Sequence, residues 1–357
     1  MSSIHIRNQG GLPARPGPAK ATAIVALLAG ASLMVGACSS SATGGQGSGS
    51  STGNSKHLHL AYFAFSQQNS YEAPQIAAAR QEASSQNADI TVFDAANNAQ
   101  TQYGQIEDAV ASGKYAGFLI DSVDGAGLVP LVKQALADHG KVVALNTVLG
   151  PDLTKLAPQI AGVSASVVYT AFDRGQHEGR LVLQACAGVS GECEVGYVYD
   201  FKASGFDQGV RSGLDSVISA NPAIKVVAEG EDSFTATGGL AAAQTMLQAH
   251  PDIDVLVGSD QGMAGATQAV SAARKTAQIK IIGLGGSTAG LARVKAGTWF
   301  GDCPTLPATQ GRVAAQALVK AIRQGVDSGG LNPAANLPDG GLATKANAAE
   351  FTGEWAG

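Results

Sequence analysis

The short motifs that mark catalytic sites are missing from this chain or stand in the wrong context. The run "GSGSS" contains serines, but it lies in a Ser/Gly-rich segment and not between a strand and a helix, where a nucleophile elbow stands. The run "GLGGSTAG" follows a strand and could suggest dinucleotide binding, yet no suitably spaced acidic residue follows it in a βαβ unit. Neither a Walker A sequence nor an HExxH zinc motif occurs. The sequence therefore predicts a protein that is not an enzyme and that holds no cofactor and no metal.

The four cysteines are the other residues with chemistry of their own. Cys186 and Cys193 are separated by six residues, two of them glycine, so a local disulfide is easy to close; two unpaired thiols are the alternative. None of the six histidines stands near them, which disfavours a zinc site. Cys303 is left over, and we expect a buried free thiol because no basic residue that would activate it is evident.

The N-terminus indicates export. Three basic residues precede an apolar run over residues 21–37, which has the length of a signal segment and is short for a membrane span. The run ends in "VGAC", and small residues before Cys38 resemble a bacterial lipobox, whose cysteine receives lipid. A plain secretory signal or a short anchor helix are the alternatives. We expect residues 1–37 to be a signal peptide that is followed by a lipidated Cys38.

Composition separates a linker from a folded body. Residues 38–56 are rich in Ser and Gly and, as a random coil, would span about 23 Å root-mean-square. Hydrophobic residues make up 45% of the chain and charged ones 14%, with 46 glycines, which is typical of a compact α/β protein. The formal charge is −5 overall and −8 without residues 1–37, which carry three positive charges and no acid. An acidic body without a Lys/Arg cluster predicts that nucleic acid is not a partner.

Strand and helix patterns alternate from residue 57 onward. Apolar strands spaced by helices indicate βαβ units and therefore parallel sheets. The alternation runs once and then restarts, which predicts an α/β fold of two doubly wound lobes. We expect strands at 57–65, 89–95, 115–122, 141–147, 193–200, 224–231, 253–260 and 279–286, and helices at 71–86, 101–112, 127–140, 179–188, 207–222, 235–251 and 262–274.

Several stretches placed on these elements resemble one known family. They are "FDAANNAQTQYGQIEDAVASGKYAGFLIDSVD", "FTATGGLAAAQTMLQAHPDIDVLVGSDQGMAGATQAV" and "IIGLGGSTAGLARVKAGTWFGDCPTLPATQGRVAAQ". The chain from about residue 57 to its end is similar to type I periplasmic binding proteins of the ribose/galactose-binding kind, which capture substrate for ABC sugar importers. The resemblance implies two Rossmann-like lobes joined by three crossings. Residues 57–168 with 306–325 would form the N-terminal lobe, and residues 169–305 with 326–357 the C-terminal lobe.

The resemblance also implies where a ligand binds. In open α/β sheets, ligands lie beyond the carboxyl ends of the strands. Planar polar side chains there would bond to sugar hydroxyls, and aromatic rings would stack on the sugar's C–H faces. The candidate ligand-binding residues are Ser66, Gln67, Gln68, Asn69, Tyr71, Asp121, Asn146, Thr147, Phe206, Asp207, Gln208, Phe234, Ser259, Asp260, Gly285 and Thr305.

Some of these residues have a structural alternative or depart from the family. Asp260 could instead cap a helix, and Trp299 is expected in the core. Asn146, Gln208 and Gly285 stand where the family commonly places charge. A cleft with fewer charges disfavours ribose and galactose, so we expect a smaller polyol, a modified sugar or another neutral metabolite.

The functional prediction is a monomeric solute receptor, held to the cell membrane by its lipid anchor, that hands a small polar ligand to an ABC permease. Its two lobes would close on the ligand, with hinges near 168–171, near 302–306 and after Gln324. A receptor that presents its ligand to a membrane sensor kinase is one alternative. A secreted carbohydrate-active enzyme on the same scaffold is another.

Overall fold

The computed structural model describes residues 56–357. Cys38 and nearly all of the Ser/Gly linker lie outside the described residues, so the signal peptide, the lipid anchor and the linker stay predictions. Within residues 56–357, no helix is both long and apolar enough to cross a membrane.

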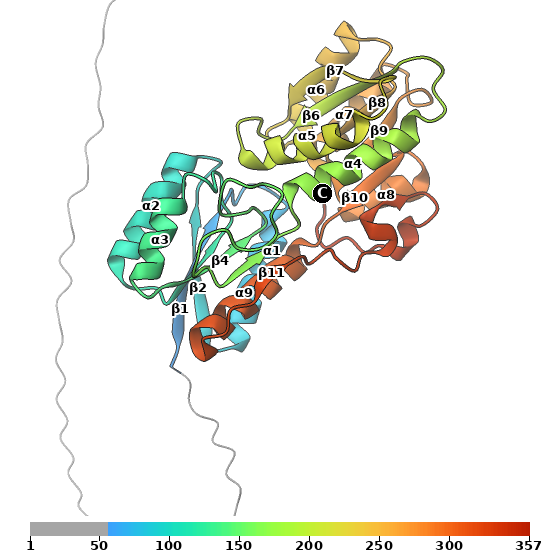
Figure 1. The fold of residues 1–357 in the computed structure, drawn as a ribbon. Coiled ribbons are helices and arrows are strands. Elements are labelled where there is room, and N and C mark those ends of the chain that lie inside the picture. The colour runs from blue at the N-terminus through green and yellow to red at the C-terminus, as the bar shows by residue number, and fades with distance from the viewer. Residues whose placement is uncertain (1–55) are drawn as a thin grey trace, which may run out of the picture. The chain divides into compact units, whose positions relative to one another are not determined.

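The first lobe is built on a six-stranded sheet whose neighbouring strands are all parallel, in the order β11-β5-β4-β3-β1-β2. Alternate residues of β1 point to opposite faces. Leu60 and Tyr62 pack under α1 and α9, whereas Ala61 and Phe63 pack under α2 and α3. The two pairs of helices lie on opposite sides of the sheet (Figure 1). The elements are β1 (Leu58–Ala64), α1 (Glu72–Ser85), β2 (Ala88–Asp94), α2 (Ala99–Ser112), β3 (Gly117–Ile120), α3 (Val129–Ala137), β4 (Lys141–Leu145), β5 (Ala165–Val167), α9 (Pro307–Gln324) and β11 (Gly329–Leu331).

The second lobe repeats this plan with the order β12-β10-β9-β8-β6-β7, in which only the β10–β12 pair is antiparallel among the described strands. One face of its sheet packs against α4 and α5, and the other against α6 and α7. The elements are α4 (Ala171–Cys186), β6 (Cys193–Tyr199), α5 (Gly205–Ile218), β7 (Ile224–Glu231), α6 (Ala236–Ala249), β8 (Val255–Ser259), α7 (Asp260–Ala272), β9 (Lys280–Gly285), α8 (Thr288–Ala296), β10 (Gly301–Pro304), η1 (Pro338–Gly341), β12 (Ala343–Thr344) and η2 (Ala348–Glu350).

The chain passes between the two sheets three times, at 168–170, 305–306 and 332–337. One predicted boundary is wrong at the third passage. Residues from 326 onward were assigned to the second lobe, but β11 pairs with β5 in the first sheet. Three residues make a strand too short to leave a pattern in the sequence.

Both lobes confirm the predicted α/β class, and several local predictions hold as well. Cys186 and Cys193 form a disulfide with a Cα–Cα distance of 5.7 Å. It joins the end of α4 to the first residue of β6. Cys303 is a free, fully buried thiol, and Trp299 is in the core.

Candidate functional site

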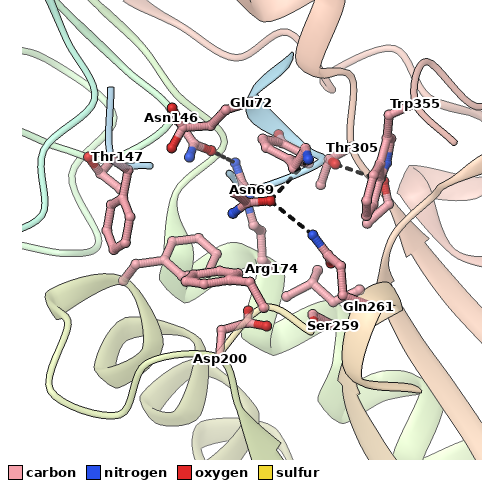
Figure 2. A pocket seen from close by; sticks show the side chains of 16 residues that line it. Asn69, Glu72, Asn146, Thr147, Arg174, Asp200, Ser259, Gln261, Thr305 and Trp355 are labelled. Atoms are coloured by element: carbon pink, nitrogen blue, oxygen red, sulfur yellow. Dashed lines mark hydrogen bonds between the residues drawn. The ribbon is translucent and has the colours of Figure 1, made fainter. Parts of the chain in front are cut away.

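A cavity of about 50 Å³ lies where strand ends of the two sheets meet (Figure 2). The carboxyl ends of parallel strands present their following loops at the same edge, which is where α/β sheets bind ligands. The cavity takes residues from both lobes. It is lined by Phe65, Asn69, Tyr71, Glu72, Asn146, Thr147, Arg174, Asp200, Phe206, Phe234, Ser259, Gln261, Leu284, Gly285, Thr305 and Trp355.

Arg174 is the only cationic side chain among these lining residues of the described chain, and it is almost fully buried. It stands in the first turn of α4, in the second lobe, and donates through Nη2 to Asn146 Oδ1 of the first lobe at 2.9 Å (Figure 2). Its Nε donates to the Tyr169 carbonyl oxygen at 2.9 Å, which fixes the guanidinium. The guanidinium carbon lies 5.2 Å from the centre of the Phe206 ring, within the range of a cation–π contact.

The hydrogen bonding that joins Arg174 to Asn146 continues from Asn146 to a buried carboxyl group, Asp121, behind the cavity. Asn146 has a positive φ of 61°, a conformation that Asn tolerates better than most residues. Its Nδ2 donates to Asp121 Oδ2 at 3.1 Å, and Thr147 Oγ1 donates to Asp121 Oδ1 at 3.2 Å. Burial raises the pKa of Asp121 to about 7, although these hydrogen bonds and the charge of Arg174 act to lower it. Arg174, Asn146 and Asp121 therefore form one hydrogen-bonded chain that spans the lobes.

Two lining carboxyl groups each keep one buried oxygen without a hydrogen-bond partner among residues 56–357: Glu72 through Oε2 and Asp200 through Oδ1. Glu72 uses its other oxygen to accept the Ser66 backbone N–H at 2.7 Å. Burial, with the nearby charge of Asp121, raises the pKa of Glu72 well above its ordinary range. Burial and the neighbouring Asp232 do the same for the pKa of Asp200. Buried polar atoms are nearly always paired in proteins, so these two oxygens are available to form hydrogen bonds with a ligand.

Aromatic rings form much of the remaining wall. Phe65 meets Phe234 edge to face with ring centroids 5.8 Å apart. Tyr71 meets Trp355 in the same way at 5.6 Å. Trp355 is held by a hydrogen bond from its Nε1 to the Gly285 carbonyl oxygen at 2.9 Å. Such faces pack well against the C–H surface of a small ring or chain.

A second hydrogen bond between the lobes lies on the same wall. Gln261 of α7 donates through Nε2 to Asn69 Oδ1 at 3.0 Å, and the Tyr71 backbone N–H donates to the same oxygen at 3.0 Å (Figure 2). Both lobes thus contribute amide groups to one small space. The cavity has the polar groups needed to hold a ligand by its hydroxyls. It lies between two lobes that the chain connects by three short crossing segments.

Residues 60–325 match the family model described as a periplasmic binding protein domain. The match covers more than half of the chain. The chain belongs to the periplasmic binding protein family.

Individual members of this family are more distant. The ribose import binding protein of Salmonella typhimurium is 27% identical over 233 residues, which cover 64% of this chain and 73% of that protein. The xylitol-binding protein of Mycolicibacterium smegmatis is 29% identical over 238 residues, covering 64% of this chain and 63% of that protein.

Solved structures of solute-binding proteins share the fold. An ABC transporter solute binding protein from Mycobacterium smegmatis, with bound glycerol, has a TM-score of 0.70 and 22% identity and covers 85% of this chain and 100% of its own. The Caulobacter myo-inositol binding protein has a TM-score of 0.70 and 22% identity, covering 84% and 97%. The known relatives named here are binding proteins and not enzymes.

Nine of the sixteen residues predicted from the sequence line the cavity of this periplasmic binding protein. They come from both lobes and lie at or just after the carboxyl ends of seven different strands. They are Asn69, Tyr71, Asn146, Thr147, Phe206, Phe234, Ser259, Gly285 and Thr305.

Four of the other predicted residues are buried and serve the protein's own backbone or side chains. Ser66 lies behind the first loop and donates its N–H to Glu72. Asp207 accepts the backbone N–H groups of residues 200 and 201 and does not line the cavity. Asp260 accepts the Ser287 N–H at 2.7 Å; the cap of α7 is Ser259 and not Asp260, because the Ser259 hydroxyl accepts the Gly262 N–H. Asp121 lies behind Asn146 and acts through it.

The last three predicted residues are exposed glutamines outside the cavity. Gln67 lines none of the hollows described here, and Gln68 borders a separate hollow that Asp260 also lines. Gln208 lines a larger hollow of about 540 Å³, which shares Thr147 and Phe206 with the cavity. Gln208 is therefore placed beside the cavity and not within it.

Seven lining residues were not predicted: Phe65, Glu72, Arg174, Asp200, Gln261, Leu284 and Trp355. Most of them are next to a residue that was predicted, so a wider reading of each strand-end loop would have included them. Arg174 and Trp355 are different. Arg174 lies within a helix, and Trp355 is the third residue from the end of the sequence, on a segment that returns to the end of β9 and the start of α8 through hydrogen bonds. The sequence alone carries no signal for either position.

Proposed function

We propose that this protein is the extracytoplasmic substrate-binding lipoprotein of an ABC importer and that it captures a small neutral sugar or polyol. The family supports the role, because its members bind solutes outside the cytoplasm. Relatives whose names specify ribose and xylitol, and structures with bound glycerol and myo-inositol, support the ligand class. The protein would act as a monomer and without catalysis, anchored by lipid on Cys38 and delivering its ligand to a membrane permease.

The observation that carries the ligand class is the pair of unpartnered oxygens in an aromatic-walled cavity. Glu72 Oε2 and Asp200 Oδ1 have no hydrogen-bond partner among the described residues, and a polyol's hydroxyls can both donate to and accept from a neutral carboxyl group. The rings of Phe65, Phe234 and Trp355 line the cavity and offer apolar surface against which the ligand's C–H groups would pack. The raised pKa values of Glu72 and Asp200 favour their neutral forms, which suit an uncharged ligand.

The proposed mechanism is closure of the two lobes on the ligand. Asn69 and Asn146 of the first lobe already bond to Gln261 and Arg174 of the second. A ligand that touches both lobes binds the closed form better than the open one and so shifts the population toward it. The crossings at 168–170, 305–306 and 332–337 are the segments that would turn. The closed form would be the one that the permease recognises.

A thermal-shift screen of neutral sugars and polyols, followed by calorimetric titration of each hit, tests the ligand class. We expect saturable binding at one site with no conversion of the ligand. Ligand-induced closure is checked separately by the change in tryptophan fluorescence, since Trp355 lines the cavity. A panel in which no neutral polyhydroxyl compound binds, or in which a charged compound alone binds, would contradict the proposal.

Variants test the site. Asn146→Ala and Asp200→Ala should each weaken binding by about 10-fold or more, because each removes a hydrogen-bonding group from the buried wall. Gln67→Ala is the matched control: Gln67 is exposed on the same loop as Asn69 and lies outside the cavity. If Gln67→Ala weakens binding as strongly as Asn146→Ala does, the ligand sits elsewhere on this loop.

The anchor is tested in cells. Labelled palmitate should attach to the wild-type protein, and Cys38→Ala should release the protein from the membrane fraction. Unchanged anchoring of Cys38→Ala would refute the lipoprotein prediction and leave the ligand site unaffected.

A further inference from the structure

Two histidines and an aspartate meet at the amino-terminal end of the first sheet. His57 directly precedes β1, His59 is its second residue, and both side chains are exposed. Asp89 lies on β2, in direct register with His59. Residues two apart on a strand share a face, and a residue in register on the next strand shares that face as well. The strand pairing therefore brings all three side chains together in solvent.

The donor atoms of the three side chains are close. His57 Nε2 lies 2.6 Å from Asp89 Oδ1, and His59 Nδ1 lies 2.7 Å from the same oxygen. The three donor atoms all lie within 4.8 Å of one another. Two imidazole nitrogens thus converge on a single oxygen of the Asp89 carboxylate.

We propose that His57, His59 and Asp89 form a binding site for a divalent transition-metal cation of the Zn²⁺ class. Imidazole nitrogen and carboxylate oxygen are standard zinc ligands, and three of them leave a fourth position for water. Zinc bonds of about 2.0–2.1 Å in a tetrahedron separate donor atoms by about 3.3 Å. The two histidine–aspartate distances would have to widen by about 0.6 Å, a small rotation for exposed side chains.

The surroundings orient one ligand and leave room for water. His57 Nδ1 lies 3.0 Å from Asn87 Oδ1, and a hydrogen bond there presents Nε2 to the metal position. A hollow of about 410 Å³ adjoins the cluster and is lined by His57, Asn87 and Asp89. Metal-binding histidines are commonly held by such an outer hydrogen bond.

Nearby positive charge sets a limit on the affinity. Arg80 lines the same hollow, and Arg323 donates to the backbone carbonyl of Gln86 at 2.8 Å, next to Asn87. Both cations disfavour a bound cation, so we expect a micromolar rather than a nanomolar dissociation constant.

This site is independent of the proposed solute site. The cluster is at the amino-terminal ends of β1 and β2, whereas the cavity lies beyond the carboxyl ends of the strands. The proposed zinc site departs from the sequence-based expectation of no metal. The sequence separates His59 from Asp89 by thirty positions, and only the register of β1 and β2 brings them together. A bound metal would cross-link the first residues of the folded body to the edge strand β2.

The test is a Zn²⁺ titration of the full chain, purified without a polyhistidine tag and stripped with a chelator, against a chromophoric zinc indicator. We expect one equivalent with micromolar affinity. His59→Ala and Asp89→Asn should each weaken it by at least tenfold. Co²⁺ in place of Zn²⁺ should give visible absorption bands that these variants lose.

His139→Asn is the matched control. His139 is exposed in the same lobe and has a φ of 64°, a conformation that Asn also adopts, so this change removes an imidazole without straining the backbone. It should leave the affinity unchanged. Circular dichroism confirms that each variant is folded, and His57→Ala replaces any variant that is not. Millimolar binding, a stoichiometry well above one, or equal affinity in wild type, His59→Ala and His139→Asn would show an adventitious ion only and overturn the proposal.

Discussion

Asp121 links the cavity to the pH dependence of stability. Its carboxyl group is fully buried, accepts hydrogen bonds from Asn146 and Thr147, and has a pKa raised from 3.8 to about 7. Between those two values the folded protein binds a proton that the unfolded chain has released. By linkage, the contribution of this group to the free energy of unfolding falls as pH rises through this window. Asp121 therefore makes the protein less stable at pH 8 than at pH 5.

The size of the effect follows from the two pKa values. Integrating the proton difference from pH 5 to pH 8 gives a loss of about 2–3 kcal/mol from Asp121 alone. Unfolding roughly 300 ordered residues has an entropy of about 0.6 kcal/mol/K, so the loss corresponds to about 4 °C in Tm. Asp121→Asn cannot ionise and should remove this part of the pH dependence.

Calorimetric Tm values at pH 5, 6, 7 and 8 test this expectation. The wild-type Tm should fall across this range. Asp232 adds to the fall caused by Asp121, because burial raises the pKa of Asp232 to about 7 as well. The fall should be about 4 °C smaller in Asp121→Asn. Asp124→Asn is the control, since Asp124 is exposed three residues away and should keep the wild-type slope. Equal slopes in Asp121→Asn and wild type would show that Asp121 titrates at an ordinary pH, and the account of its burial would be wrong.

Three further outcomes are expected. Arg174→Met removes both hydrogen bonds of the guanidinium but keeps a long side chain, so calorimetric titration should show ligand affinity about 10- to 150-fold lower. Replacing Cys186 and Cys193 by Ala opens a short loop and should cost about 2.5 kcal/mol of stability, or about 4 °C in Tm, with unchanged ligand affinity. Gly213→Ala would place a methyl group 2.0 Å from the Phe172 carbonyl oxygen between α4 and α5 and should cost about 3 kcal/mol in chemical denaturation, whereas Gly104→Ala, with open space around it, should cost none.

The main elements of the fold were predictable because their signals are local. The helix α5 carries its own periodicity, with Val210, Leu214 and Ile218 buried at a spacing of four, and the disulfide closes a loop of only six intervening residues. The strands β5 and β11 were missed for the opposite reason. Each has three residues, and they become strands only because β5 pairs with β4 and β11 pairs with β5.

The sequence predicted those lining residues of the cavity whose positions follow from the strand order alone. Asn69 and Asn146 follow strands and Ser259 ends one, and parallel strands bring such positions to one edge of a sheet. Arg174 escaped prediction because its role depends on reaching Asn146 of the other lobe from within a helix. Asp207 shows the reverse error. Both carboxylate oxygens of Asp207 accept hydrogen bonds from backbone N–H groups. The residue type alone does not reveal whether an acidic residue after a strand binds the backbone or a ligand.

The two ends of the first sheet present opposite kinds of site, and the reason lies in how the strands are covered. At the carboxyl ends the second lobe covers the loops, so Glu72 and Asp121 are buried, their pKa values rise, and the cavity suits a neutral ligand. At the amino-terminal ends the side chains of His59 and Asp89 are 62% and 50% exposed, so their donor atoms stay accessible to a cation from solvent. Burial of carboxyl groups would thus select hydroxyls at the proposed solute site, and exposure of imidazole and carboxylate together would select metal at the proposed zinc site. A polyol that binds the cavity should therefore leave zinc affinity unchanged, and zinc should leave polyol affinity unchanged; coupling between the two would show that the lobes transmit strain along the length of β1.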